Sequence, residues 1–228
     1  MAKKLFVTGT GTDVGKTFVA GLIVKKLHNA GLNTAYYKCA ASGNCRDETG
    51  TLASGDALWV KKTSGIEQNV ATMCPYVYET AASPHLASRL EGNRVRLEVV
   101  KSSFDFLCRR FDYVVVEGSG GIVCPILLEE TTILLEDVVR ELDLSCLIVS
   151  NSGLGAINGV ALTVDYQRAR NIPIRGIVLN RFVPGNFIEE DNIVVCERIT
   201  GVPVVGCVQE NALELDVETE VLKNLFFE

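Results

Sequence analysis

The sequence predicts an α/β fold in which helices cover both faces of a doubly wound, mostly parallel sheet. Short apolar runs alternate along the chain with segments of helical periodicity, which is the order expected of β-α-β units. Some of these runs are apolar at nearly every position, such as YVVVE at 113–117, as is typical of parallel strands buried on both faces. The chain of 228 residues has the length of one such domain, and we expect residues 1–228 to form it.

The predicted elements follow from local patterns. KLFVT at 4–8 is a first strand that ends in a glycine-rich turn, and apolar residues at helical spacing predict a helix at 14–29, which Gly31 can end. Further strands are expected at 34–38, 113–117, 145–150, 174–180 and 202–206. Further helices are expected at 98–110, 134–142, 156–170 and 187–200, with a short amphipathic helix at 217–227.

Residues 40–92 do not follow this alternation. The segment is rich in Gly, Ser, Thr and Pro and has weak periodicity. In α/β domains such an insertion usually covers the carboxyl ends of the strands, where ligands bind. We therefore expect it to contribute to an active site.

Composition excludes several classes of protein. The net charge of −6 and the pI of about 5.1 argue against nucleic acid or an anionic membrane as the main partner. No apolar run is long enough for a signal-peptide core or a membrane span, so a cytoplasmic location is expected. Eight cysteines without a C-x-x-C pair, and only two histidines, give little support for a structural zinc site.

The strongest motif is GTGTDVGKT at 9–17, which stands between a predicted strand and a predicted helix. In this context glycines let backbone N–H groups turn toward a phosphate, and the helix N-terminus adds its positive dipole end. Lys16 can reach the outer phosphates and Thr17 can offer its hydroxyl to Mg²⁺. The motif departs from the common G-x-x-x-x-G-K-[ST] pattern, because Thr10 occupies the place of the leading glycine and Gly9 precedes it.

Two carboxylates are candidates for holding that Mg²⁺. Glu117 ends the apolar strand at 113–117 and precedes a flexible glycine-containing loop, so its side chain is expected to face the phosphate loop. Asp56, in SGDA at 54–57, is a second and weaker candidate, since aspartate is frequent in loops.

Together these motifs resemble dethiobiotin synthetase, a family of P-loop nucleoside triphosphate hydrolase fold. The resemblance rests on GTGTDVGKT at 9–17, YYKCAASG at 36–43, SGDA at 54–57, SPH at 83–85, EGSGG at 117–121 and GLGAIN at 153–158, in the family's order. Cys39 stands where the family usually has proline, Ser119 replaces a common alanine, and Gly159 stands where histidine is frequent.

The resemblance implies ring-closing carboxylation of 7,8-diaminononanoate with CO₂ and ATP, giving dethiobiotin for biotin synthesis. It also implies a homodimer with its active site near the subunit interface. Lys38 and Lys16 would be catalytic, and Thr17, Asp56 and Glu117 would hold Mg²⁺. The residues implied in nucleotide binding are Asp13, Val14, Gly15, Lys16, Thr17, Phe18, Asp56, Glu117, Gly118, Ser119, Gly120 and Asn180. Those implied in binding the diamine are Thr12, Ser42, Leu154, Gly155 and Asn158.

The chemistry of the implied reaction suits two lysines. Negative charge gathers on the carbamate, the γ-phosphate and the leaving ADP, and cations can stabilise it. We therefore assign electrostatic stabilisation to Lys38, and proton transfer only as a secondary role. Gly153 and Gly155, which open a helix, could form an anion site for the substrate carboxylate, or serve only a backbone turn, or both.

Two rival hypotheses remain at this point. One is another amide-forming or carboxylating P-loop enzyme, such as a cobyrinic acid diamide synthase, from which YYKCAASG distinguishes the chain. The other is an ATP-driven switch of the partition or iron-protein class that acts through protein partners. Loops of that class usually carry an extra lysine near their start, where Gly11 stands here.

Overall fold

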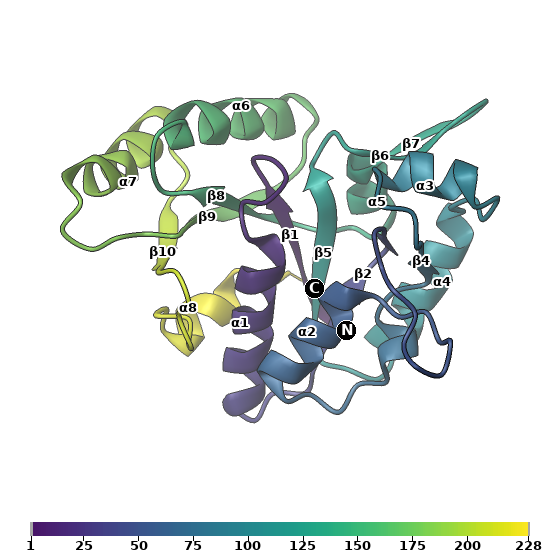
Figure 1. The fold of residues 1–228 in the computed structure, drawn as a ribbon. Coiled ribbons are helices and arrows are strands. Elements are labelled where there is room, and N and C mark those ends of the chain that lie inside the picture. The colour runs from purple at the N-terminus through teal and green to yellow at the C-terminus, as the bar shows by residue number, and fades with distance from the viewer. Residues whose placement is uncertain (1, 228) are drawn as a thin grey trace.

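A six-stranded parallel sheet forms the centre of the computed structural model, which describes residues 2–227 (Figure 1). Its strand order is β10-β9-β8-β1-β5-β2, so the chain leaves β1 and adds strands on both sides of it. The strands are β1 (Lys3–Gly9), β2 (Thr34–Lys38), β5 (Tyr113–Gly121), β8 (Cys146–Asn151), β9 (Ile174–Asn180) and β10 (Val204–Val208). The predicted doubly wound α/β fold is confirmed.

Helices connect the strands and cover both faces of the sheet. They are α1 (Lys16–Asn29), α2 (Gly55–Ser64), α3 (Pro84–Leu90), α4 (Leu97–Cys108), α5 (Leu135–Glu141), α6 (Ala156–Ala169), α7 (Phe187–Thr200) and α8 (Thr219–Asn224). Smaller elements are the parallel pair β3 (Ala40–Ala41) and β4 (Tyr76–Val77), the antiparallel pair β6 (Pro125–Leu128) and β7 (Thr132–Leu134), and a 3₁₀ turn at Val70–Thr72.

Alternate residues of the central strands pack into different cores. In β1, Leu5 and Val7 belong to the core beneath α1, whereas Phe6 belongs to the core that includes residues of α4 and α5. Helices α6 and α7 cover β8 and β9 with a third apolar cluster. Because both faces are buried, the central strands are apolar at nearly every position.

The observed boundaries differ from the predicted ones at several ends. Helix α1 begins at Lys16 instead of residue 14, because Asp13 and Gly15 adopt left-handed conformations with φ of 58° and 89°. Strand β10 lies two residues later than predicted, and the C-terminal helix is limited to Thr219–Asn224. The segment 40–92 contains α2 and α3, which weak periodicity did not reveal.

Strand β2 lies at the edge of the sheet, yet the chain that follows covers part of its outer side. The backbone N–H of Tyr36 donates to Gln68 Oε1 at 2.8 Å, and Gln68 Nε2 donates to the carbonyl of Tyr36 at 3.0 Å. Two residues on, the N–H of Lys38 donates to the carbonyl of Met73 at 2.8 Å. Residues 68–73 thus fix the position of β2 from outside the sheet.

Across residues 2–227, every helix is too short or too polar to cross a membrane.

Candidate active site

The phosphate loop leaves the carboxyl end of β1 and enters α1. Gly15 has a φ of 89°, and a Cβ atom there would collide with the side chain of Asn180, so only glycine fits. Asn180, at the end of β9, donates from Nδ2 to the carbonyl of Val14 at 3.0 Å, and this hydrogen bond stabilises the loop. Lys16 is buried and donates from Nζ to the carbonyl of Gly11 at 2.8 Å, across the loop.

Three oxygen-bearing side chains meet beside this loop. Thr17, in the first turn of α1, donates from Oγ1 to Glu117 Oε1 at 2.7 Å and to Asp56 Oδ1 at 3.3 Å. Glu117 comes from β5 and is 1% exposed, whereas Asp56 stands in the first turn of α2. The N-cap Ser54 fixes that turn by accepting from the N–H of Ala57. The structure therefore brings all three predicted metal-binding residues together.

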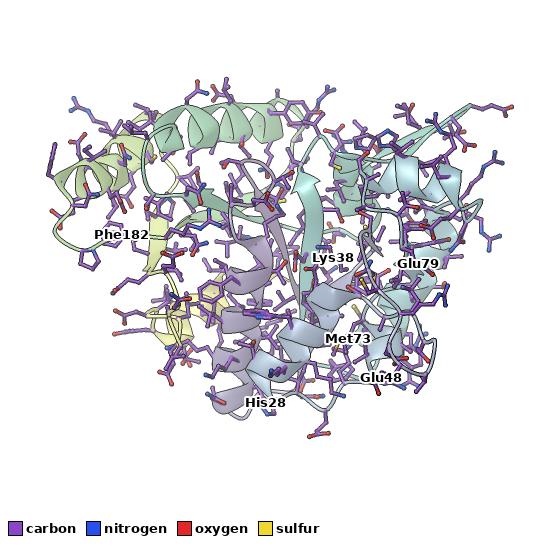
Figure 2. All side chains as sticks on the ribbon, in the orientation of Figure 1. His28, Lys38, Glu48, Met73, Glu79 and Phe182 are labelled. Carbon is purple, nitrogen blue, oxygen red and sulfur yellow. The ribbon has the colours of Figure 1, made fainter. Side chains whose placement is uncertain are left out.

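Lys38 joins the two carboxylates. It lies opposite Glu117 in the parallel pair of β2 and β5, near the centre of the molecule in Figure 2. Its Nζ lies 2.6 Å from Asp56 Oδ2 and 2.8 Å from Glu117 Oε1. Burial by itself lowers the pKa of Lys38, but Glu117 and Asp56 outweigh it, and the pKa is raised above its ordinary value. Lys38 therefore remains an ammonium ion.

The second cation, Lys16, has a different environment. Burial lowers the pKa of Lys16, Glu117 opposes this shift, and the nearby charge of Lys38 adds to it. An anionic ligand beside the loop would favour the charged form of Lys16. Lys38 is thus a cation in contact with both carboxylates, and a ligand phosphate would help to hold Lys16 charged.

The set of ligands fits a hard divalent cation. Carboxylate and hydroxyl oxygens are the donors that Mg²⁺ prefers, and Mg²⁺ usually takes one or two carboxylates and completes its shell with phosphate and water. Glu117, Asp56 and Thr17 supply this set. The ammonium of Lys38, which bridges the two carboxylates, shows that their oxygens can converge on one positive charge.

Sequence reasoning missed Tyr36 in this cluster. Its hydroxyl donates to Glu117 Oε2 at 2.6 Å, and the side chain is fully buried. Burial first, and then the charge of Glu117, raises the pKa of Tyr36, so the hydroxyl keeps its proton. The available signal was the strand period of two, which places Tyr36 and Lys38 on the same face of β2.

One cleft of about 1280 Å³ is lined by the two lysines and by the three oxygen-bearing side chains of Thr17, Asp56 and Glu117. Of the predicted site residues, the cleft is lined by Thr12, Asp13, Gly15, Lys16, Thr17, Phe18, Lys38, Ser42, Asp56, Glu117, Ser119 and Gly120. The segment 40–92 contributes part of its wall, including Ser42 and the residues Ala81–Pro84. Val14, within the phosphate loop, and Asn180, at the end of β9, are buried and do not line the cleft. Gly118 also lies outside the lining, and an added Cβ there would meet Phe6 and Leu135.

The predicted diamine-binding residues of the GLGAIN segment lie elsewhere. Asn158 lines a second cavity of about 590 Å³, which shares Thr12, Gly120 and Cys124 with the cleft. Leu154 is 89% exposed, and neither it nor Gly155 lines either of these two cavities. Within the single chain, the structure does not bring Leu154 and Gly155 to the lysines.

Comparison with known proteins identifies the family. Residues 3–216 match the family described as AAA domain. The "ATP-dependent dethiobiotin synthetase BioD" of Brachyspira hyodysenteriae is 42% identical over 217 residues, which cover 95% of this chain and 96% of that protein. The protein of the same name from Clostridium botulinum strain Alaska E43 is 38% identical over 99% of both chains. The chain belongs to the dethiobiotin synthetase family of ATP-dependent ligases. Both matches extend over nearly the whole length of this chain and of the relative.

Solved structures share the fold at much lower identity. The MinC:MinD cell division protein complex of Aquifex aeolicus matches with a TM-score of 0.58 and 14% identity, over 98% of this chain and 86% of that one. A ParA family ATPase from Chlorobium tepidum also gives 0.58 and 14%, over 99% and 89%. These likenesses show the P-loop fold that this member of the dethiobiotin synthetase family adopts, and they carry no further information about its activity.

Proposed function

We propose that this enzyme uses ATP and Mg²⁺ to carboxylate 7,8-diaminononanoate with CO₂ and close the ring of dethiobiotin, a step of biotin synthesis in the cytoplasm. The observation that carries the proposal is the contact of Lys38 with both carboxylates beside the phosphate loop, in a member of the dethiobiotin synthetase family. Further support comes from the cleft itself, which is lined by Lys16, Lys38 and Ser42 together with the three candidate metal ligands Thr17, Asp56 and Glu117.

The proposed reaction begins with an amine of the substrate adding to CO₂, which gives a carbamate and releases a proton. The carbamate oxygen attacks the γ-phosphate of ATP and displaces ADP. The product of this step is a mixed carbamic-phosphoric anhydride. The second amine then attacks the anhydride carbon, loses a proton as the new C–N bond closes the ring, and expels phosphate through cleavage of the C–O bond. Bound Mg²⁺ would neutralise charge on the β- and γ-phosphates.

The lysines of this chain suit the first two steps. Lys38 remains protonated between its carboxylates, so it can stabilise the carbamate and the transferring phosphoryl group without itself accepting a proton. Lys16 spans the phosphate loop and would exchange its contact with Gly11 for the outer phosphates when ATP binds. Thr17, Asp56 and Glu117 would hold the metal.

We propose that the diamine extends from Ser42 past Thr12 toward the second cavity and a partner copy of the chain. Support comes from the residues shared by the two cavities and from the exposure of Leu154 (89%), Leu162 (61%) and Val123 (48%), which a homodimer would cover. In such a homodimer, the partner's GLGAIN segment could approach the carboxylate end of the substrate.

The deciding experiment is an assay of ATP hydrolysis with 7,8-diaminononanoate and bicarbonate, with dethiobiotin measured by mass spectrometry. ADP should form in equal amount to dethiobiotin and only when the diamine is present. ATP hydrolysis that does not depend on the diamine but increases with a protein partner would instead favour a switch of the partition type. The fold is compatible with such a switch, because it is shared with proteins of that kind.

A further inference from the structure

We propose that Tyr36 is a positioning residue for the metal site, because its buried hydroxyl fixes the rotation of the Glu117 carboxylate. The proposal rests on the Mg²⁺ site described above and adds to it a side chain that does not touch the metal. The proposal is based on the different hydrogen-bond donors of the two Glu117 carboxylate oxygens. Glu117 Oε2 accepts from Tyr36 at 2.6 Å, whereas Oε1 accepts from Thr17 at 2.7 Å and Lys38 at 2.8 Å.

The two oxygens thus have separate roles. Oε1 contacts Thr17 and Lys38, which both line the cleft in which we propose that the nucleotide and the cation bind. Oε2 points to the buried side, where Tyr36 is its hydrogen-bond donor. Without that donor, Oε1 would keep its contacts with Thr17 and Lys38, but Oε2 would lose its hydrogen bond. The carboxylate would then rotate more freely about its terminal bond and would present its oxygens to the metal less precisely.

Tyr36 is itself held firmly. Its backbone N–H and carbonyl both bind the side chain of Gln68, at 2.8 Å and 3.0 Å. Its ring lies in the core beneath α1 and is 0% exposed. Because both Tyr36 and Glu117 are buried, bulk water cannot easily replace a lost phenol hydroxyl. The chain therefore provides a rigid donor for one oxygen of one metal-binding carboxylate.

The same strand supplies a matched control. Tyr37 is also 0% exposed, and its hydroxyl donates to the carbonyl of Val100 at 2.8 Å. It points to the opposite face of the sheet, into the core that contains Phe104. Tyr37→Phe thus removes a buried tyrosine hydroxyl and its hydrogen bond from β2 without touching Glu117.

The experiment compares Tyr36→Phe, Tyr37→Phe and the wild type in two measurements. The first is the Mg²⁺ concentration that gives half-maximal dethiobiotin formation. The second is calorimetric binding of a non-hydrolysable ATP analogue with and without Mg²⁺, which needs no turnover. Tyr36→Phe should raise the half-maximal Mg²⁺ concentration about tenfold or more, as is usual when a partner of a metal ligand is lost. It should also reduce the tightening of analogue binding by Mg²⁺, while binding without Mg²⁺ stays as in the wild type.

Tyr37→Phe should leave both quantities unchanged, even if both variants melt at lower temperature. Equal Mg²⁺ dependence in Tyr36→Phe and Tyr37→Phe would overturn the proposal and leave Tyr36 a structural residue. If Tyr36→Phe does not fold, Tyr36→Met also removes the hydroxyl and replaces the ring with a flexible apolar side chain that can fill irregular core space. Tyr36→Met should raise the Mg²⁺ requirement above that of Tyr37→Phe, and an unchanged requirement in this variant would overturn the proposal. Should the wild type form no dethiobiotin, the proposed function fails, but the binding measurement still tests Tyr36.

Discussion

Lys38 and Glu117 are paired residues of neighbouring parallel strands, and their side chains form an ion pair of 2.8 Å on the same face of the sheet. Asp56, from a helix 18 residues further along the chain, completes the contact at 2.6 Å. One ammonium group thus contacts both carboxylates, so the proposed catalytic lysine and the proposed metal site are electrostatically coupled. Substitutions in this cluster should therefore separate nucleotide binding, metal binding and turnover in different ways.

Lys16→Ala should lower kcat by on the order of 10²-fold or more, because it removes a cation from the transferring phosphates. Steady-state turnover of ATP, diamine and bicarbonate measures the effect. Lys25→Ala is the control, since Lys25 lies on the same helix and binds the carbonyl of Leu213 away from the cleft. Near-normal turnover by folded Lys16→Ala protein would contradict the assigned role of the phosphate loop.

Lys38→Gln should abolish dethiobiotin formation while ATP still binds. The amide can keep a hydrogen bond to the carboxylates but cannot supply the positive charge that the carbamate and the phosphoryl group need. Calorimetric binding of ATP and single-turnover product formation separate the two effects. If binding collapses and the remaining bound ATP reacts normally, Lys38 belongs to the nucleotide site instead.

Glu117→Gln and Asp56→Asn should each raise the Mg²⁺ concentration that gives half-maximal activity, since an amide oxygen carries no full charge for the cation. Glu67→Gln, at an exposed position outside the cleft, is the control. Mg²⁺ titrations of initial rate provide the measurement. Unchanged titrations in both cleft variants would remove these carboxylates from the metal site.

Ser119→Ala should lower the free energy of unfolding by about 1 kcal/mol, because the Ser119 hydroxyl donates to the carbonyl of Ala40 at 2.7 Å. For a chain of this size the melting temperature should fall by roughly 2–4 °C. Ser102→Ala is the control, since Ser102 is exposed and bonds only within its own helix. Equal melting temperatures for Ser119→Ala and the wild type would mean that the bond contributes nothing to stability.

The enzyme should select the nucleotide base weakly, with GTP and CTP used about 10-fold less efficiently than ATP, the effect of one modest hydrogen bond. Asn180 already uses Nδ2 to hold the phosphate loop, and its Oδ1 is a buried acceptor that has no hydrogen-bond partner within residues 2–227. The stretch Cys207–Gln209 has no proline, although a proline is usual there in the family. Values of kcat/KM for the three nucleotides decide the matter, and a preference for ATP above about a thousandfold would reveal a complete adenine pocket.

The sequence predicted the fold well because strands buried on both faces leave continuous apolar runs, and all six central strands were expected close to their observed positions. It predicted α2 and α3 poorly. Helix α2 is short, is initiated by the Ser54 cap, and has its apolar side interrupted by lysines. Such helices depend on tertiary packing more than on a local pattern.

The candidate site was predictable in part. The phosphate loop is a local motif, and Glu117 ends a recognisable strand, but Lys38 was identified only by resemblance to the family. Tyr36 and Gln68 were missed because their hydrogen bonds join residues 81 and 32 positions apart in the chain. No local pattern records such pairs. The register of β2 against β5 accounts for the contact between Tyr36 and Glu117, but Gln68 lies outside both strands. The placement of Leu154 and Gly155 relative to a bound substrate stays a prediction.

The cover over β2 also has a consequence for solubility. An edge strand with free backbone groups is a template on which another chain can add a strand and start an aggregate. Here Gln68 binds both backbone groups of Tyr36, and Met73 accepts from the N–H of Lys38, so this part of the edge cannot accept a foreign strand. A single glutamine side chain and one carbonyl therefore protect the strand that carries Lys38 from edge pairing with another chain.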